Sequence, residues 1–144
     1  MLKDKNIFIN IVLCVWQITQ IIVGIVCLAV FRNYEKYTNE YNGITVLKIC
    51  HNGLFGRACF STGPFVIVDS KNVHNEILKH ETGHSKQSLY FGPIYHLLIS
   101  LPSICLFLIK RITHKDGTWY HSHYPENWAD RCGGVNLDII LNKS

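Results

Sequence analysis

The longest charge-free stretch of this chain runs from Asn6 to Phe31 and holds 26 residues, most of them aliphatic or aromatic. As a helix it would reach about 39 Å, which exceeds the bilayer hydrocarbon core of about 30 Å. We therefore predict an N-terminal transmembrane helix, with residues 1–33 as a membrane anchor. A secretory signal peptide is the alternative that the basic start favours, but the apolar run is too long and no convincing small-residue cleavage site follows it.

A second charge-free run extends from Gln87 to Ile109. Its core, Ile94 to Ile109, is short for a membrane span and contains Pro102. Because proline breaks or kinks a helix, we predict a re-entrant or interfacial helical hairpin over residues 93–109. A buried core helix is the alternative.

The net charge of +4 does not indicate a nucleic-acid-binding protein, because no dense basic cluster occurs. Basic residues lie on both sides of the first apolar run, so the orientation of the chain in a membrane stays open. We predict a single-pass membrane protein with a membrane-associated hairpin. The basic residues after the second run are expected to contact the head groups of membrane lipid, a predicted partner. They are Lys110, Arg111 and Lys115.

Between the two runs, residues 80–84 read His-Glu-Thr-Gly-His. Composition alone predicts roughly 0.015 matches to this pattern, so chance is a poor explanation. On a helix the two imidazoles share one face, where they can bind a single zinc ion, and Glu81 can act on a water bound there. The predicted helix begins at Ser70 or Asn72 and ends at Gly92-Pro93. Gly83, which disfavours a helix, suggests that another backbone passes close by.

A catalytic zinc site usually has three protein ligands, and the last predicted helix supplies candidates for the third. It begins at Pro125 and ends at Gly133-Gly134. Glu126 and Asp130 are four residues apart and lie on one face. One can bind the metal, and the other can accept the free ring N–H of a ligand histidine and fix its tautomer.

The remaining segments predict an α+β domain over residues 34–144. Strands are expected at Ile44–Cys50, Leu54–Phe60 and Phe65–Val68, with an Asn52-Gly53 turn joining the first two into an antiparallel hairpin. Cys50 and Cys59 could then face each other, and whether they pair is left open.

The motif His80-Glu81-x-x-His84, followed by Glu126-x-x-x-Asp130 on a later short helix, resembles the gluzincin clan of zinc metallopeptidases. The short spacing between the two motifs resembles the single-domain minigluzincins. The resemblance covers roughly residues 44–138. It implies a zincin-like fold: a small antiparallel sheet, an active-site helix and a short ligand helix. It also implies that His80, His84 and Glu126 ligate zinc, that Glu81 is general base and acid, and that Asp130 orients a histidine.

The chain departs from the gluzincin pattern in three ways. Pro125 replaces the usual asparagine, an apolar run separates the two helices, and the large second subdomain is missing. Aspzincins and metzincins fit less well because their additional ligand motifs are absent. An intramembrane protease is disfavoured by the charges on the His80 helix. Substrate pockets therefore cannot be transferred from the resemblance.

The predicted activity is zinc-dependent cleavage of peptides or protein segments near a membrane. An oxyanion donor is expected close to Glu126 in sequence. The alternative functions are a non-catalytic membrane-anchored metal-binding or sensing protein, and a membrane scaffold with a chance match. The candidate donors are His121, His123 and Tyr124, with Tyr120 and Arg131 as further possibilities.

Overall fold

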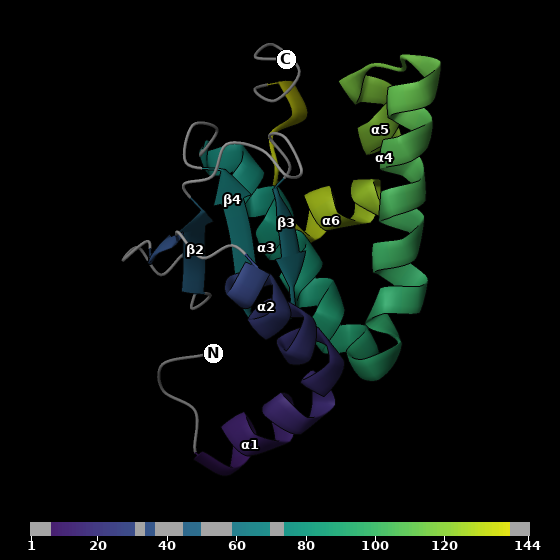
Figure 1. The fold of residues 1–144 in the computed structure, drawn as a ribbon. Helices are drawn as coiled ribbons and strands as arrows, with labels where there is room; N and C mark the ends of the chain where they lie inside the picture. The colour runs from purple at the N-terminus through teal and green to yellow at the C-terminus, as the bar shows by residue number, and fades with distance from the viewer. Residues whose placement is uncertain (1–6, 31–33, 37–44, 50–58, 70–73, 139–144) are drawn as a thin grey trace.

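A computed structural model describes residues 7–30, 34–36, 45–49, 59–69 and 74–138. The described chain is mostly helical, with a small sheet (Figure 1). The helices are α1 (Ile7–Trp16), α2 (Ile18–Val30), α3 (Asn75–Phe91), the 3-10 helix η1 (Gly92–Ile94), the π-helix η2 (His96–Ser100), α4 (Leu101–Thr113), α5 (Gly117–Ser122) and α6 (Glu126–Gly133).

The sheet contains β1 (Tyr34–Lys36), β2 (Thr45–Ile49), β3 (Phe60–Thr62) and β4 (Phe65–Asp69), in the order β1-β2-β4-β3. β3 and β4 form an antiparallel pair through a turn at Gly63, whose φ of +59° suits glycine. β2 instead pairs parallel to β4. The strands predicted at Ile44–Cys50 and Phe65–Val68 therefore exist, but a wholly antiparallel sheet is wrong.

The predicted strand Leu54–Phe60 and its hairpin with the preceding strand lie almost entirely outside the described residues, which include only positions 59 and 60 of that strand. β3 pairs with β4 and not with β2, because the tight turn at Gly63 holds β3 against the following strand. The Asn52-Gly53 turn and Cys50 lie outside the described residues.

β4 forms the centre of the core, and α3 packs against the sheet and carries α6 on another side. Val66, Ile67 and Val68 are each no more than 2% exposed. The predicted helix over the His80 motif is confirmed as α3, which ends at Gly92 with a φ of +49°. Residues 70–73, where its start was expected, are not described.

The first apolar run does not form the single continuous helix that we predicted. It is divided at Gln17 into α1 and α2, which meet at an angle of 80°. We call residues 16–20 the elbow. Gln17 and Gln20 are buried at the elbow although they are polar, because both hydrogen-bond to the C-terminal part of α3 and η1. These tertiary contacts lie at the bend, and the composition of the apolar run does not reveal them.

Residues 96–113 form one continuous helix, so the hairpin predicted within residues 93–109 is wrong. His96–Thr113 is long and apolar enough to cross a membrane, and only 6% of it is buried. Pro102 lies in the first turn of α4, directly after the π-helical stretch. The amide missing from Pro102 would donate to the Leu98 carbonyl in an α-helix, and the Tyr124 hydroxyl donates to that carbonyl instead, at 2.9 Å.

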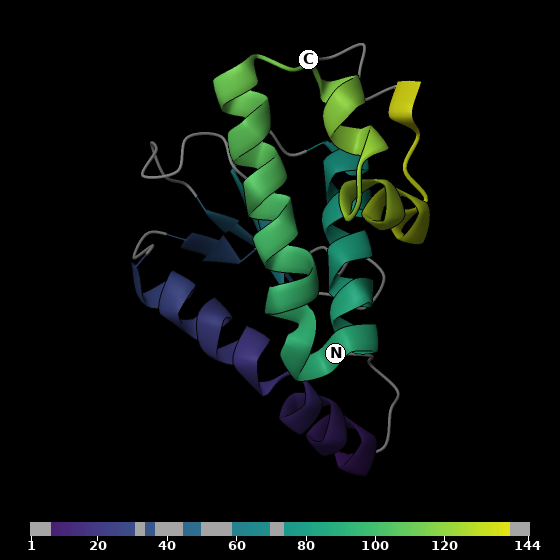
Figure 2. The ribbon, with the colours of Figure 1, turned by 90° about the vertical axis from the view of Figure 1, so that its right-hand side faces the viewer.

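The helices therefore include one or two segments that are long and apolar enough to span a membrane, the second being the bent pair α1 and α2. In Figure 2, α3 and α4 leave a common turn at the lower end, and α1 and α2 lie at that same end. α6 packs on α3, α5 packs on α6, and α4 packs on α5. α6 and α5 thus lie between α3 and α4 and connect them away from their common turn.

Candidate metal centre

α3 places His80 and His84 one turn apart with their Nε2 atoms facing the same carboxylate. The Oε2 atom of Glu126, at the start of α6, lies 3.0 Å from His80 Nε2 and 3.3 Å from His84 Nε2. The three residues are 8%, 6% and 0% exposed, respectively. Their ligand atoms lie within 4.8 Å of one another, so this group can hold a metal ion. The structure thus brings together the three residues predicted as ligands.

Two glycines allow α3 and α6 to cross at backbone contact, and this crossing positions Glu126. A Cβ atom on Gly83 would lie 1.9 Å from the carbonyl oxygen of Ala129. A Cβ atom on Gly133 would lie 2.0 Å from the carbonyl oxygen of Lys79. Each helix therefore contributes one glycine that faces the backbone of the other. The close approach predicted from Gly83 is confirmed.

The second ring nitrogen of each histidine is held by a separate oxygen. His80 Nδ1 lies 2.7 Å from Asp130 Oδ1, and His84 Nδ1 lies 2.8 Å from Gln87 Oε1. An Nδ1–H donated to these acceptors leaves Nε2 unprotonated and facing Glu126, which is the arrangement a metal-ligating histidine needs. Asp130 therefore lies where it was predicted to lie.

Gln87 was not predicted as a site residue, although its position three residues after His84 on the same helix could have indicated it. Its side-chain amide also donates to the carbonyl of Pro125 at 3.3 Å. Gln87 is fully buried and so joins His84 to the beginning of α6.

The charged groups of this cluster shift one another's pKa. Burial lowers the pKa of His80, but hydrogen bonds to Asp130 and Glu126 more than offset it and raise the pKa to about 10. Burial raises the pKa of Glu126, and hydrogen bonds to His80 and His84 more than offset it, so the pKa lies below its usual range. Without a metal ion, His80 is therefore protonated and paired with two carboxylates at neutral pH.

Glu81 follows His80 and is 4% exposed. Burial raises its pKa, and the charges of His80 and His84 oppose this rise only in part. Within the described part of the chain, two buried carboxylate oxygens find no hydrogen-bond partner, Glu81 Oε2 and Glu126 Oε1. Buried acceptors of this kind cost free energy unless a proton donor or a cation satisfies them. The donor set of two imidazoles and a carboxylate, with these two oxygens, fits a metal ion.

A second group that can hold a metal ion consists of His80, His121 and Asp130. It shares His80 with the first group, and His121 Nδ1 lies 2.9 Å from Asp130 Oδ2. The first group contains both histidines of α3, and its three members are all buried, whereas His121 of the second group is only partly buried. Asp130 bridges His80 and His121, so His121 supports the orientation of His80 through Asp130.

The other candidate oxyanion donors lie further from the cluster. His123 is exposed and its Nδ1 atom lies 2.7 Å from the carbonyl oxygen of Trp119. Tyr124 is 49% exposed and donates to Leu98. Tyr120 lies closer, since the charge of Glu126 adds to burial in raising its pKa.

Tyr95, which had no predicted role, is 2% exposed and lies near Glu81. It follows the helix in sequence and no local motif marks it.

Comparisons of the chain with protein-family models, with curated proteins and with solved structures gave no match. The case for a metal centre therefore rests on the residues and geometry described above.

Proposed function

We propose that this protein is a membrane-associated zinc endopeptidase with a gluzincin-like site, acting on peptides or protein segments near a bilayer. The observation that carries the proposal is the convergence of His80 Nε2, His84 Nε2 and Glu126 Oε2 beside the buried Glu81. Zinc is the favoured ion because two imidazoles and one carboxylate, with one position left for water or substrate, are typical of catalytic zinc sites.

In this proposal each residue has one role. Bound zinc would supply Lewis-acid activation of the attacking water and of the scissile carbonyl. Glu81 accepts the proton of the attacking water and then gives it to the leaving amine. Its raised pKa suits both steps, because the carboxylate becomes a stronger base while the acid form stays accessible. Asp130 and Gln87 hold the histidine rings in one tautomer.

The exchange of Glu81 for glutamine tests this proposal. Glu81→Gln keeps the size of the side chain and removes its basicity, while His80, His84 and Glu126 stay in place. We expect zinc to copurify at about one ion per chain and turnover of fluorogenic peptides to fall by about 10²–10⁴-fold. Asp138→Asn, at an exposed position outside the cluster, is the matched control and should leave both readouts unchanged. A Glu81→Gln protein that cleaves peptides at the normal rate would contradict the mechanism.

The deep burial of all three ligands favours a second candidate, a non-catalytic metal-binding or sensing protein. Such a protein would bind metal without cleaving any peptide. The wild-type protein separates the two functions: an endopeptidase cleaves a peptide library only when zinc is present, and a sensor does not cleave it at any metal loading.

A further inference from the structure

The turn between α3 and α4 presents a large apolar surface, and we define residues 89–98 as the hairpin tip. No charged residue occurs from position 87 to position 109. Several large apolar side chains of the tip are exposed by one third or more, and α1 at the same end of the molecule is exposed along most of its length (Figure 2). The exposed apolar side chains of the tip include Leu89, Tyr90, Ile94, Leu97 and Leu98.

Two backbone carbonyls, one at the end of α3 and one in η1, accept hydrogen bonds from side chains of the elbow. A helix leaves its last four carbonyls without an intrahelical partner, and in water-exposed proteins solvent often supplies the missing donors. Here the indole Nε1–H of Trp16 donates to the Leu89 carbonyl at 2.9 Å. The side-chain amide of Gln20 donates to the carbonyl of Gly92. Protein side chains therefore supply donors to two carbonyls at this helix end.

The other polar groups of the elbow are also paired within the protein. The Gln17 amide donates to the hydroxyl of Ser88 at 2.7 Å, and the Thr62 hydroxyl donates to the backbone carbonyl of Gln20 at 2.8 Å. The Leu98 carbonyl, opposite the missing amide of Pro102, receives the Tyr124 hydroxyl. Internal pairing of backbone groups is what a hydrocarbon environment requires, because no water is available there.

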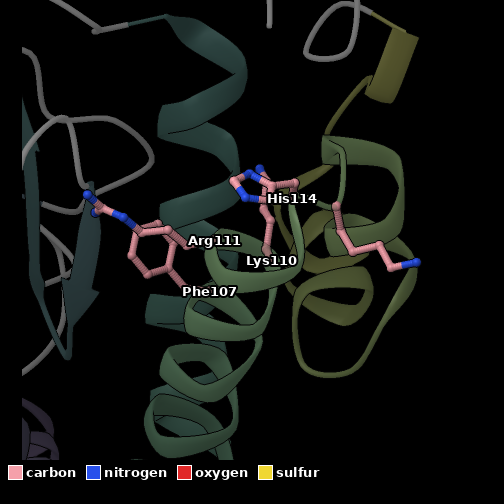
Figure 3. A pocket seen from close by; sticks show the side chains of 5 residues that line it. Phe107, Lys110, Arg111 and His114 are labelled. Atoms are coloured by element: carbon pink, nitrogen blue, oxygen red, sulfur yellow. The ribbon is translucent and has the colours of Figure 1, made fainter.

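The opposite end of α4 is basic. An open pocket there is lined by Phe107, Lys110, Arg111, His114 and Lys115 (Figure 3). It shares no residue with the metal centre. Cations next to an apolar helix suit anionic lipid head groups. From Lys110 to His96 the helix extends about 21 Å, so with Lys110 at the head groups α4 is long enough to bring the tip to the middle of a core of about 30 Å, which lies about 15 Å deep.

We propose that the hairpin tip, the elbow and the apolar part of α4 form a re-entrant membrane insert, whose tip lies in the hydrocarbon of one bilayer and whose Leu89, Gly92 and Leu98 carbonyls accept hydrogen bonds from within the protein. Both arms then return to the same face of the membrane, so the beginning of α3, the metal centre and Lys115 share one side. This proposal concerns the placement of the chain and does not depend on peptidase activity.

The depth of single tryptophans in vesicles tests the insert. The chain contains Trp16, Trp119 and Trp128, so two variants isolate the informative positions: Trp119→Phe/Trp128→Phe leaves Trp16 at the elbow, and Trp16→Phe/Trp128→Phe leaves Trp119 near the basic end of α4. Each is reconstituted in vesicles of phosphatidylcholine and phosphatidylglycerol. The vesicles carry a spin-label quencher either at the bilayer centre or at the head groups.

We expect Trp16 to lose more fluorescence to the central quencher and Trp119 to lose more to the head-group quencher. Stronger quenching of Trp16 at the head groups would mean that α4 crosses or lies in the interface, and would overturn the proposal. Absence of quenching at Trp16 would place the elbow in water and would overturn it as well. Circular dichroism of both variants shows that they are folded, and wild-type protein in the same vesicles controls for insertion.

Discussion

The exchange of Gly83 for alanine tests how the metal centre is assembled. In an ordinary exposed helix this change stabilises the protein by about 1 kcal/mol, because glycine is a poor helix former. In α3 the added Cβ would lie 1.9 Å from the Ala129 carbonyl oxygen. The two backbones would have to separate by about 1.5 Å to reach ordinary contact, whereas metal–ligand distances tolerate only about ±0.2 Å. We therefore expect Glu126 to leave the two histidines.

The expected results are loss of about 1–3 kcal/mol of unfolding free energy from overpacking and a large loss of zinc affinity. Chemical denaturation measures the first, and competition with a chromophoric zinc chelator measures the second. Gly134→Ala is the control: its Cβ meets no atom within 4 Å, and only its φ of +71° opposes the change, so zinc affinity should persist. A Gly83→Ala protein that is more stable than wild type and binds zinc equally well would refute this account of the crossing.

Four further predictions concern the metal centre and the elbow. Asp130→Asn, which removes the carboxylate behind His80, should weaken zinc binding by about 10–100-fold in a chelator competition, and unchanged affinity would contradict its orienting role. Zinc affinity should rise by about tenfold for each pH unit between pH 6 and 8, because the metal must displace the proton of His80, whose pKa is about 10 in the metal-free protein. The same raised pKa stabilises the metal-free fold fully below pH 6.5, and this stabilisation is lost as the pH rises through 10, so thermal melts of chelator-treated protein should shift down over that range. Gln20→Leu removes the side-chain donor to the Gly92 carbonyl, which keeps only the Tyr95 amide, and should cost about 0.5–1.5 kcal/mol in chemical denaturation; unchanged stability would contradict the role of this hydrogen bond.

The sequence could predict the metal centre because its information is local. The spacing of His80 and His84 determines their common face on any helix, and the spacing of Glu126 and Asp130 does the same on the next one. Gly83 also indicated the close crossing. Glycine weakens a helix, so its presence in one suggests a position where a larger side chain would collide with a neighbouring backbone. The pairing of the two helices was then the simplest way to complete a three-ligand site.

Other parts of the fold depend on partners that are distant in sequence. Gln17 lies in an apolar run that looks continuous in sequence, and at the bend between α1 and α2 its side chain hydrogen-bonds to Ser88, 71 residues away. Pro102 was expected to break a helix, but the π-helical stretch before it and the Tyr124 hydroxyl accommodate the missing amide. The parallel pairing of β2 with β4 likewise depends on the path of the chain through space and not on either strand's residues.

The central claim is that one metal ion binds between α3 and α6. The most direct measurement is a crystal structure of the purified protein with anomalous scattering recorded at the zinc edge. We expect one peak, about 2.0–2.2 Å from His80 Nε2, His84 Nε2 and a carboxylate oxygen of Glu126. No peak in zinc-containing crystals, or a peak between His121 and Asp130 instead, would contradict the claim.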